Sequence, residues 1–237
     1  MVPGPRTIFQ GIEKLPPGHT ILIGPGNWQQ SARRYWRLNL ESDDHRTIDD
    51  WQQAIRAKVD DAVRAHLIAD VPVGAFLSGG VDSAVVVACA SAAMAGPLQT
   101  FSLGFLEEDF CELTAARATA VHFSTNHVEE IVAADAAHLL DQLTHHFDEP
   151  FADSSAIPTF LLARLASRTV KVALSGDGGD EAFGGYARYA HDLRESALRR
   201  WMPTWLRHGL GPLARVWPKT DWLPRSFRAK VFLTNMS

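Results

Sequence analysis

The chain has 237 residues, of which 46% are hydrophobic, and 27 acidic against 23 basic side chains give a formal net charge of −4. This balance fits a globular α/β domain with appendages and argues against a nucleic-acid-binding protein. The apolar stretches are too short to span a membrane, no signal peptide is recognisable, and Cys89 and Cys111 lack metal-ligand spacing, so we expect a cytoplasmic protein.

Residues 1–40 differ in pattern from the rest of the chain. Segments 18–23 and 33–38 flank a Gly-Pro-Gly-Asn sequence, which predicts a β-hairpin. The hairpin is either the end of a preceding domain or a plain extension of the domain that follows.

The central part alternates between helix and strand patterns. Apolar residues recur every four positions between 50 and 69, which predicts an amphipathic helix, and the apolar run 71–77 predicts a buried parallel strand. The elements expected after residue 77 are helix 83–95, strand 99–104, helix 113–122, strand 126–131, helix 135–146, helix 156–168, strand 170–174 and helix 180–193. This alternation predicts an α/β fold with a mostly parallel sheet and helices on both faces.

A loop with the sequence Ser-Gly-Gly-Val-Asp-Ser, residues 78–83, directly follows the first predicted strand of that sheet. Gly79 and Gly80 let the backbone turn tightly and approach an anion. The hydroxyls of Ser78 and Ser83 and the amides of the helix start can donate hydrogen bonds to phosphate oxygens. Because open α/β sheets bind ligands at the carboxyl ends of their strands, this loop is predicted to bind a pyrophosphate group.

Asp82 is the acidic member of this loop. Two unit charges ~4 Å apart repel by roughly 4 kcal/mol at an effective dielectric of 20, so a carboxylate beside phosphate requires a bridging cation. Carboxylate and phosphate oxygens are ligands that Mg²⁺ prefers, which makes magnesium the expected ion. The alternative is a glycine turn in which Asp82 is an ordinary helix N-cap.

A second loop of the same kind, residues 175–181, has the sequence Ser-Gly-Asp-Gly-Gly-Asp-Glu and follows the predicted strand 170–174. If the two strands are neighbours in a parallel sheet, Asp82 and Asp180 can face one metal ion from two sides. The repetition favours a magnesium-triphosphate site that uses both loops.

The pattern changes again in residues 193–237, which combine tryptophans, basic residues and four prolines. A basic helix with tryptophans can lie on a membrane, but the prolines interrupt the segment before a long amphipathic face forms. An incomplete helical subdomain is the favoured interpretation, with residues 41–192 as the central domain.

The chain resembles the synthetase domain of the glutamine-dependent asparagine synthetases, a branch of the ATP-pyrophosphatase enzymes. The resemblance rests on four blocks in family order: residues 73–83, 101–105, 148–153 and 174–186. SGGxDS alone is shared with GMP synthetases, NAD synthetases and tRNA-thiolating enzymes, and its combination with SGDGGDE and FGGY is more specific. The resemblance implies an adenine nucleotide alpha-hydrolase-like fold, and residues 9–19 resemble the end of the family's glutaminase domain.

That resemblance implies ATP-dependent asparagine synthesis. The aspartate β-carboxylate would be adenylated to β-aspartyl-AMP with release of pyrophosphate, and ammonia, drawn from glutamine in the full-length family, would then displace AMP. ATP and Mg²⁺ are the implied cofactors, a glutaminase domain or subunit is the implied partner, and a homodimer is left open.

The resemblance also assigns roles to individual residues. The implied assignments are Leu77 and Leu103 beside the adenosine, Ser175 and Gly176 on the nucleotide, Ser78, Gly79, Gly80 and Ser83 on the pyrophosphate, Asp82 and Asp180 on magnesium, and Asp177 at the aspartyl-adenylate step. Catalysis would then depend on Asp177, Asp82 and Asp180. Leu77 and Leu103 can instead be core residues, and Glu181 a charge in the first turn of a helix.

Two departures from the family pattern bear on the reaction. Val2 follows Met1 where the family has its nucleophilic cysteine, and no lysine occupies the position of the family's downstream catalytic lysine. We therefore expect a fragment with a complete nucleotide pocket and no glutaminase activity of its own. The alternatives are a relative that adenylates another carboxylate, as β-lactam synthetases and peptide cyclases do, and a catalytically silent ATP-binding module.

Overall fold

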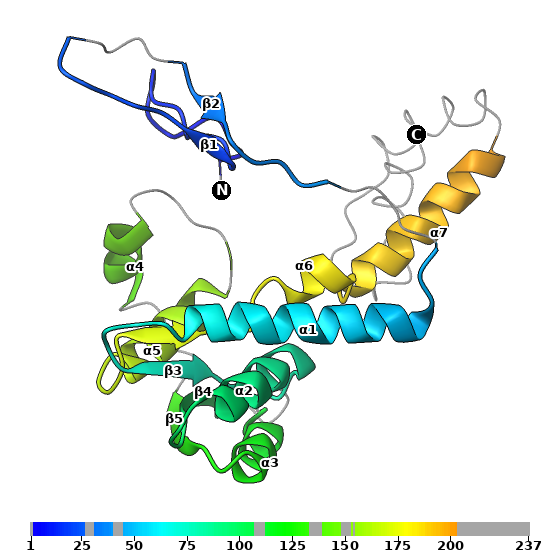
Figure 1. Cartoon of the computed structure of the whole chain (residues 1–237). Helices are drawn as coiled ribbons and strands as arrows, with labels where there is room; N and C mark the ends of the chain where they lie inside the picture. The colour runs from blue at the N-terminus through cyan, green and yellow to red at the C-terminus, as the bar shows by residue number, and fades with distance from the viewer. Residues whose placement is uncertain are drawn as a thin grey trace. The chain divides into compact units, whose positions relative to one another are not determined.

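A computed structural model describes residues 2–26, 31–39, 45–106, 112–132, 139–147, 153 and 155–202. The chain forms two compact units, Met1–Gly176 and Asp177–Ser237. Each unit is described by itself below, and Figure 1 gives the element labels. Within the described residues, no helix is both long and apolar enough to cross a membrane.

The centre of the first unit is a four-stranded sheet in the order β5-β4-β3-β6. All three pairings are parallel, with Ala75 opposite Thr100 on one side of β3 and opposite Leu174 on the other. The strands are β3 (Val73–Phe76), β4 (Gln99–Phe105), β5 (Asn126–Val132) and β6 (Val172–Leu174). The predicted parallel sheet is confirmed, and the two strands that precede the Ser-Gly loops, β3 and β6, are direct neighbours.

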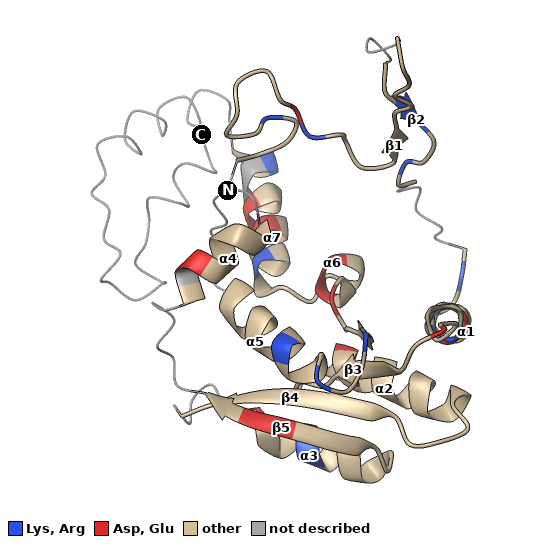
Figure 2. Ribbon diagram, turned by 90° about the vertical axis from the view of Figure 1, so that its left-hand side faces the viewer, with Lys and Arg blue, Asp and Glu red and all other residues tan. Residues whose placement is uncertain are grey.

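Helices cover both faces of this sheet, as predicted, and in Figure 2 α3 and α5 lie on opposite sides of β4 and β5. The helices of the first unit are α1 (Ile48–His66), α2 (Val81–Ala93), α3 (Leu113–His122), α4 (Leu140–Phe147) and α5 (Ala156–Ala166). Their bounds differ from the predicted ones by no more than three residues, except that residues 135–138 of the predicted helix 135–146 lie outside the described residues.

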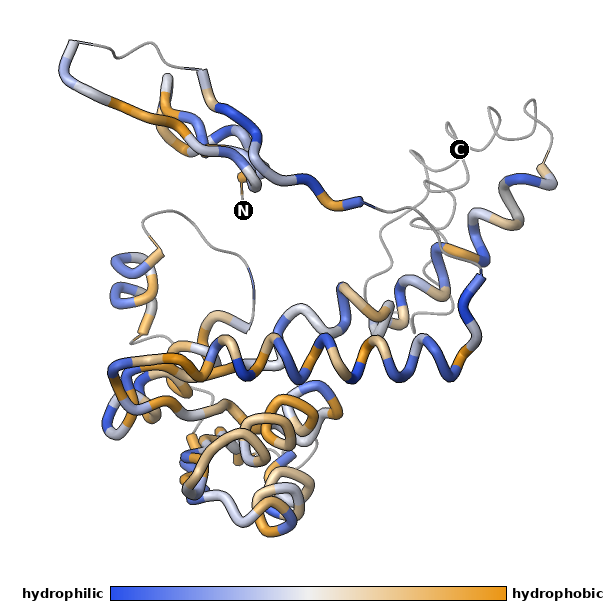
Figure 3. Tube along the Cα trace, viewed as in Figure 1, coloured by the Kyte–Doolittle hydropathy of each residue, from blue (hydrophilic) through white to orange (hydrophobic). Residues whose placement is uncertain are grey.

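Apolar side chains explain this layering, because successive residues of a strand point to opposite faces. Ala75 and Leu77 pack with apolar residues of α1, α2 and α3. On the other face, Phe101 packs with α5, and Leu103 is partly buried against residues of α4 and α5. In Figure 3 the segment of β3 is orange, which marks it as part of this hydrophobic centre.

The amphipathic helix α1 begins with a capping box. The Thr47 side chain accepts a hydrogen bond from the Asp50 amide, and the Asp50 carboxylate accepts one from the Thr47 amide at 3.0 Å. This reciprocal pair satisfies two amides that would otherwise lack partners, so the helix begins two residues before the predicted start.

The predicted N-terminal hairpin is present but short. β1 (His19–Thr20) pairs antiparallel with β2 (Arg33–Arg34), and His19 lies opposite Arg34. Part of the predicted turn, residues 27–30, lies outside the described residues.

The second unit contains two helices where the sequence predicts one helix over 180–193, so that prediction was wrong. α6 (Gly179–Phe183) ends at Gly184, whose φ of +70° is left-handed, and α7 (Ala187–Trp201) follows. A left-handed glycine is a common helix C-terminal signal, because it carries no Cβ penalty there. Residues 203–237, most of the predicted helical subdomain, lie outside the described residues, and the division at residues 40 and 192 stays a prediction.

Candidate nucleotide site

The loop at the carboxyl end of β3 is closed by its own serine hydroxyls. Ser83 Oγ accepts a hydrogen bond from the Ser78 amide at 3.1 Å and lies 2.9 Å from Ser78 Oγ. Ser78 Oγ in turn accepts a hydrogen bond from the Gly80 amide at 3.1 Å. Ser83 is buried, so these bonds lie partly shielded from water and fix the turn. The predicted role of both serines as phosphate donors stays a prediction, and in the structure they also shape the loop.

The helix that follows the loop begins without a side-chain cap. Gly80 is the N-cap of α2 and makes no side-chain cap bond, and Asp82 lies exposed in the first turn. The first amides of a helix have no intrahelical acceptor, and the helix dipole favours negative charge there. This arrangement suits an anion and also gives Asp82 a favourable place. Because Gly80 is the N-cap, the alternative that Asp82 caps the helix was wrong, and its magnesium role stays a prediction.

A carboxylate from another element already contacts the loop. The Gly79 amide donates a hydrogen bond of 3.0 Å to Oε2 of Glu112, the N-cap residue of α3. A Cβ on Gly79 would lie 3.0 Å from the Glu112 Cβ and 3.2 Å from the Ala115 Cβ. Glycine at position 79 therefore makes room for the start of α3, a contact that sequence reasoning missed because it depends on how α3 packs.

The second Ser-Gly pair lies directly beside this loop. A Cβ on Gly176 would lie 2.7 Å from the Ser83 amide nitrogen and 2.9 Å from the Asp82 carbonyl carbon. Real Cβ atoms do not approach backbone atoms this closely, so the contact requires glycine. The pairing of β3 with β6 brings Ser175 and Gly176 beside the first loop, which meets the condition that the sequence interpretation set for a shared site.

The residues next to the loop are held from β4. The Leu77 amide donates to the Phe101 carbonyl at 2.8 Å, and the hydroxyl of the buried Ser102 donates to the Leu77 carbonyl. The Leu77 side chain is 2% exposed and lies in the core, which favours the core alternative for this residue. Leu103 is half-buried. Ser102 was not among the predicted site residues, although a polar residue inside an apolar strand was a visible signal.

In the second unit, glycines shape the acidic segment. Gly178 adopts a φ of +93° before α6, and the first turn of α6 carries Asp180 and Glu181. The Gly185 amide donates to the Asp180 carbonyl at 3.0 Å, and Gly185 lies so close to the Asp180 carboxylate that a Cβ would not fit. Asp180 is half-buried by this return of the chain, and Asp177 is exposed.

Glu181 has a hydrogen-bond donor in the same unit. The Tyr186 hydroxyl donates to Glu181 Oε1 at 2.7 Å, and this bond lowers the pKa of Glu181 and raises the pKa of Tyr186 to about 12. The Arg188 guanidinium lies 4.6 Å from the centre of the Tyr186 ring. Glu181 is therefore held as an anion, and the grouping of Tyr186 with Arg188 reflects real contacts as well as helical spacing.

Asp82 belongs to the first unit and Asp180 to the second, so their sharing of one magnesium ion stays a prediction. Among the described residues, no group of three or more acidic, histidine or cysteine side chains could hold a metal ion. A site made of two carboxylates and phosphate oxygens needs no such group, since Mg²⁺ is usually bound through one or two carboxylates plus substrate phosphates.

Of the acidic residues before α5, the structure describes Asp153. Asp148 and Glu149, which belong to the block 148–153 that resembles the family, lie outside the described residues. The Asp153 carboxylate accepts hydrogen bonds from the Ser155 amide and hydroxyl at 2.9 and 2.8 Å, and these bonds lower the pKa of Asp153. Asp153 therefore stabilises the turn into α5, whose N-cap residue is Ser155.

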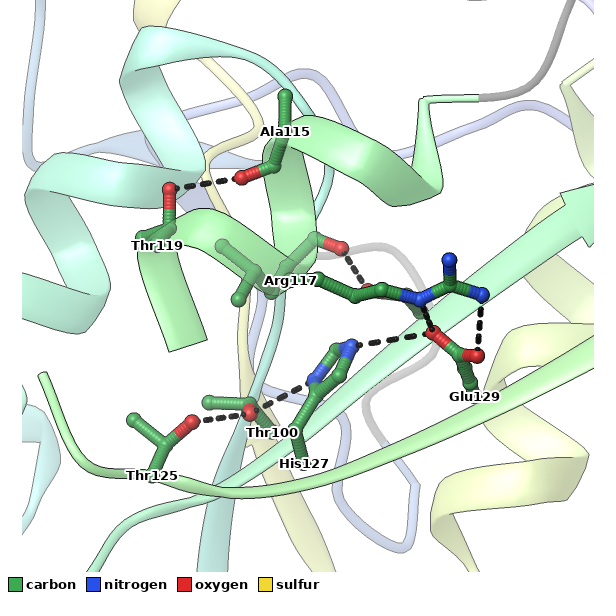
Figure 4. Close-up of polar contacts among 9 residues, drawn as sticks. Thr100, Ala115, Arg117, Thr119, Thr125, His127 and Glu129 are labelled. Carbon is green, nitrogen blue, oxygen red and sulfur yellow. Dashed lines mark hydrogen bonds and ion pairs between the residues drawn. The ribbon is translucent and has the colours of Figure 1, made fainter. Parts of the chain in front are cut away.

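A polar network fills the space between the sheet and α3 (Figure 4). Thr100 Oγ1 lies 2.8 Å from Thr125 Oγ1 and 3.0 Å from His127 Nδ1. Arg117 Nη2 and Nε donate to the Glu129 carboxylate at 2.6 and 2.8 Å, which lowers the pKa of Glu129. Burial lowers the pKa of His127, whose Nε2 has no hydrogen-bond partner but lies 3.8 Å from Glu129 Oε2. The network joins β4, β5 and α3.

Comparison with known proteins adds evidence from sequence. The asparagine synthase family model matches residues 54–236. Asparagine synthetase [glutamine-hydrolyzing] 1 of Bacillus subtilis is 34% identical over 92% of this chain and 34% of its own length. A putative asparagine synthetase [glutamine-hydrolyzing] of Mycobacterium bovis is 35% identical over 98% of this chain and 35% of its own length.

More distant matches are also found. Amidase chyE of Penicillium rubens is 28% identical over 83% of this chain and 32% of its own length. The structure of a glutamine-dependent NAD+ synthetase from Acinetobacter baumannii in complex with ADP has a TM-score of 0.42 and 20% identity over 62% of this chain and 29% of that one. The chain spans about a third of the length of the curated relatives it matches.

Proposed function

Because the chain belongs to the asparagine synthase family, we propose that it binds magnesium-ATP at the loop after β3 and serves ATP-dependent asparagine synthesis. In the first step, an oxygen of the aspartate β-carboxylate bonds to the α-phosphorus of ATP, and the bond from that phosphorus to the bridging oxygen breaks. Pyrophosphate leaves with the electron pair. Ammonia then attacks the acyl carbon, AMP leaves, and the nitrogen loses a proton to give the amide.

The adjacency of the two Ser-Gly loops is the observation that carries this proposal. Gly176 packs against the backbone of Asp82 and Ser83, so the ends of β3 and β6 form one surface at the carboxyl edge of the sheet. Ligands of open α/β sheets bind at this edge. A nucleotide that uses both loops needs this contact, whereas two unrelated turns do not.

In this proposal, the chain's own groups bind and orient the nucleotide. The amides of Gly79 and the first turn of α2, with the hydroxyls of Ser78 and Ser83, would hold the pyrophosphate part. Hydrogen bonds from the Ser78 and Gly80 amides to these hydroxyls fix the loop. Adenylation needs little from a protein beyond positioning and charge neutralisation, so a rigid loop is the main requirement.

Three carboxylates complete the proposed site. Asp82 and Asp180 would hold magnesium, which neutralises charge on the phosphate oxygens when it is bound, and Asp177 would lie at the aspartyl-adenylate step. The exposed Asp82 carboxylate at the start of α2 is chemically suited to this ion. A glutaminase domain or subunit as the source of ammonia belongs to the same proposal, since the relatives are named glutamine-hydrolyzing.

Two measurements test the proposal. Isothermal titration should detect binding of ATP to the chain only with magnesium present, and absence of ATP binding would refute the nucleotide site. Isotope exchange between pyrophosphate and ATP should depend on aspartate. Exchange that requires another carboxylic acid would replace asparagine synthesis with a related amide ligase. ATP binding without exchange or AMP formation would favour a silent ATP-binding module.

A further inference from the structure

The Glu112 carboxylate accepts the hydrogen bond from the Gly79 amide. In the proposed function, this amide donates to a phosphate oxygen instead. Gly79 N lies 3.0 Å from Glu112 Oε2. Gly79 has one N–H group, and a carboxylate oxygen and a phosphate oxygen cannot both accept a good hydrogen bond from it. The Glu112 carboxylate and a nucleotide phosphate therefore compete for the hydrogen bond from the Gly79 amide.

The position of Glu112 in α3 argues against an ordinary capping role. Glu112 is the N-cap residue of α3, a place where Ser, Thr, Asp and Asn are favoured. Its side chain makes no cap bond to its own helix and extends instead to the loop after β3. The carboxylate contact with Gly79 thus needs an explanation outside the helix that Glu112 begins.

Repulsion between negative charges adds to this competition between Glu112 and phosphate. A phosphate that reaches the loop brings negative charge next to Glu112, in addition to the exposed carboxylate of Asp82. Magnesium can bridge Asp82 to the phosphate, but Glu112 contacts an amide and not a metal ligand. Like charges at hydrogen-bonding distance repel even in an exposed setting, so Glu112 has to leave the amide when phosphate binds.

We propose, on the basis of the proposed nucleotide site, that Glu112 is an internal anion that holds the empty loop in its binding shape and is displaced by the pyrophosphate group of the nucleotide. The carboxylate keeps the Gly79 amide directed toward an acceptor, and its displacement lowers the affinity for phosphate ligands. Glu112 is thus an affinity-setting residue for this site and not a ligand of the nucleotide.

The test compares Glu112→Gln with the unchanged chain by titration with inorganic pyrophosphate and with magnesium-ATP. Glutamine keeps the size of the side chain and a hydrogen-bond acceptor but removes the charge. The dissociation constants of Glu112→Gln should fall about tenfold, a change that corresponds to one exposed charge repulsion. Glu112→Ala frees the amide but also removes the side chain that holds the loop, so it should gain less affinity than Glu112→Gln.

Asp61→Asn on α1 is the matched control, because Asp61 is exposed and the substitution makes the same charge change outside the loop after β3. Its affinities should equal those of the unchanged chain. Thermal unfolding of every variant should be measured to check that the fold is kept.

Weaker or equal binding by a folded Glu112→Gln would overturn the inference, since loss of the charge would then bring no gain in affinity. An equal gain in Asp61→Asn would also overturn it, because the effect would then come from net charge. If the unchanged chain binds neither ligand, the proposed nucleotide site fails and this inference fails with it. Binding by the unchanged chain with no gain in Glu112→Gln refutes the inference alone.

Discussion

The loops after β3 and β6 have similar sequences, but different interactions fix their conformations. Hydrogen bonds among Ser78, Gly80 and Ser83 fix the first loop. The second segment depends on glycines, at position 176 for close approach and at positions 178 and 184 for left-handed backbone. A shared motif of serine, glycine and aspartate therefore does not imply a shared structure.

Loss of the aspartate should have the same effect on activity in both loops. Asp82→Ala and Asp180→Ala should each lower magnesium-dependent ATP use by about 100-fold, the size expected when a charge-stabilising group is lost. Unfolding should change little, because Asp82 is exposed and neither residue belongs to a described core cluster. Initial rates of pyrophosphate exchange at several magnesium concentrations provide the measurement.

The exposed Asp141→Ala, in the first turn of α4, is the control for these two variants and should leave the exchange rate unchanged. Full activity in either aspartate variant would mean that the metal is held elsewhere.

A Cβ at position 176 should disturb the contact between Gly176 and the first loop. Gly176→Ala places a Cβ 2.7 Å from the Ser83 amide nitrogen, so one of the two loops has to move. Overpacking of this kind costs about 1–3 kcal/mol, and ATP affinity should fall with it. Urea unfolding followed by titration separates the two effects.

Gly96→Ala serves as the matched substitution, because nothing lies within 4 Å of a Cβ at position 96. Equal stability of Gly176→Ala and Gly96→Ala would show that the close approach of the loops is not maintained in solution.

Loss of a hydroxyl should weaken the first loop. Ser83→Ala removes the acceptor of the Ser78 amide and should cost about 1–2 kcal/mol, since a partly buried donor loses its partner. Ser78→Ala keeps that bond and should cost less. Unfolding free energies of the two variants give the comparison. A larger loss of stability in Ser78→Ala would contradict the expectation that the bond to Ser83 contributes more.

The His127 network provides a reference outside both loops. Burial lowers the pKa of His127 below its ordinary value of 6.5, so the unfolded chain binds the proton more readily. The stability that comes from neutral His127 is present above about pH 6.5 and is lost as the pH falls below it. Arg117 and Glu129 are the charged groups facing the ring, and Glu129 titrates in a more acidic range.

His127→Gln should therefore flatten the fall in melting temperature between about pH 7.5 and 5.5. The effect should be smaller than those above, and ATP affinity at pH 7.5 should not change. An unaltered slope would mean that another group titrates in this range.

Strand and helix order followed from the sequence because the apolar patterns are local. The alternating runs placed β3 through β6, whereas the direct pairing of β3 with β6 entered the sequence interpretation only as a condition. The break between α6 and α7 was missed although Gly184 and Gly185 marked it, since the helical period continues on both sides. The contacts of Glu112 and Ser102 could not be predicted, because they depend on how β4 and α3 pack beside the loop.

The pairing of β3 with β6 also has a consequence for the order of folding. Ala75 pairs with Thr100, 25 positions away, but Val73 pairs with Val172, 99 positions away. A longer loop costs more entropy to close, so the β3–β4 ribbon can form well before β6 joins it. During synthesis on the ribosome, the first loop would emerge and close by itself, whereas Gly176 reaches it only after the whole sheet has been made. Nucleotide affinity would then report the last step of assembly.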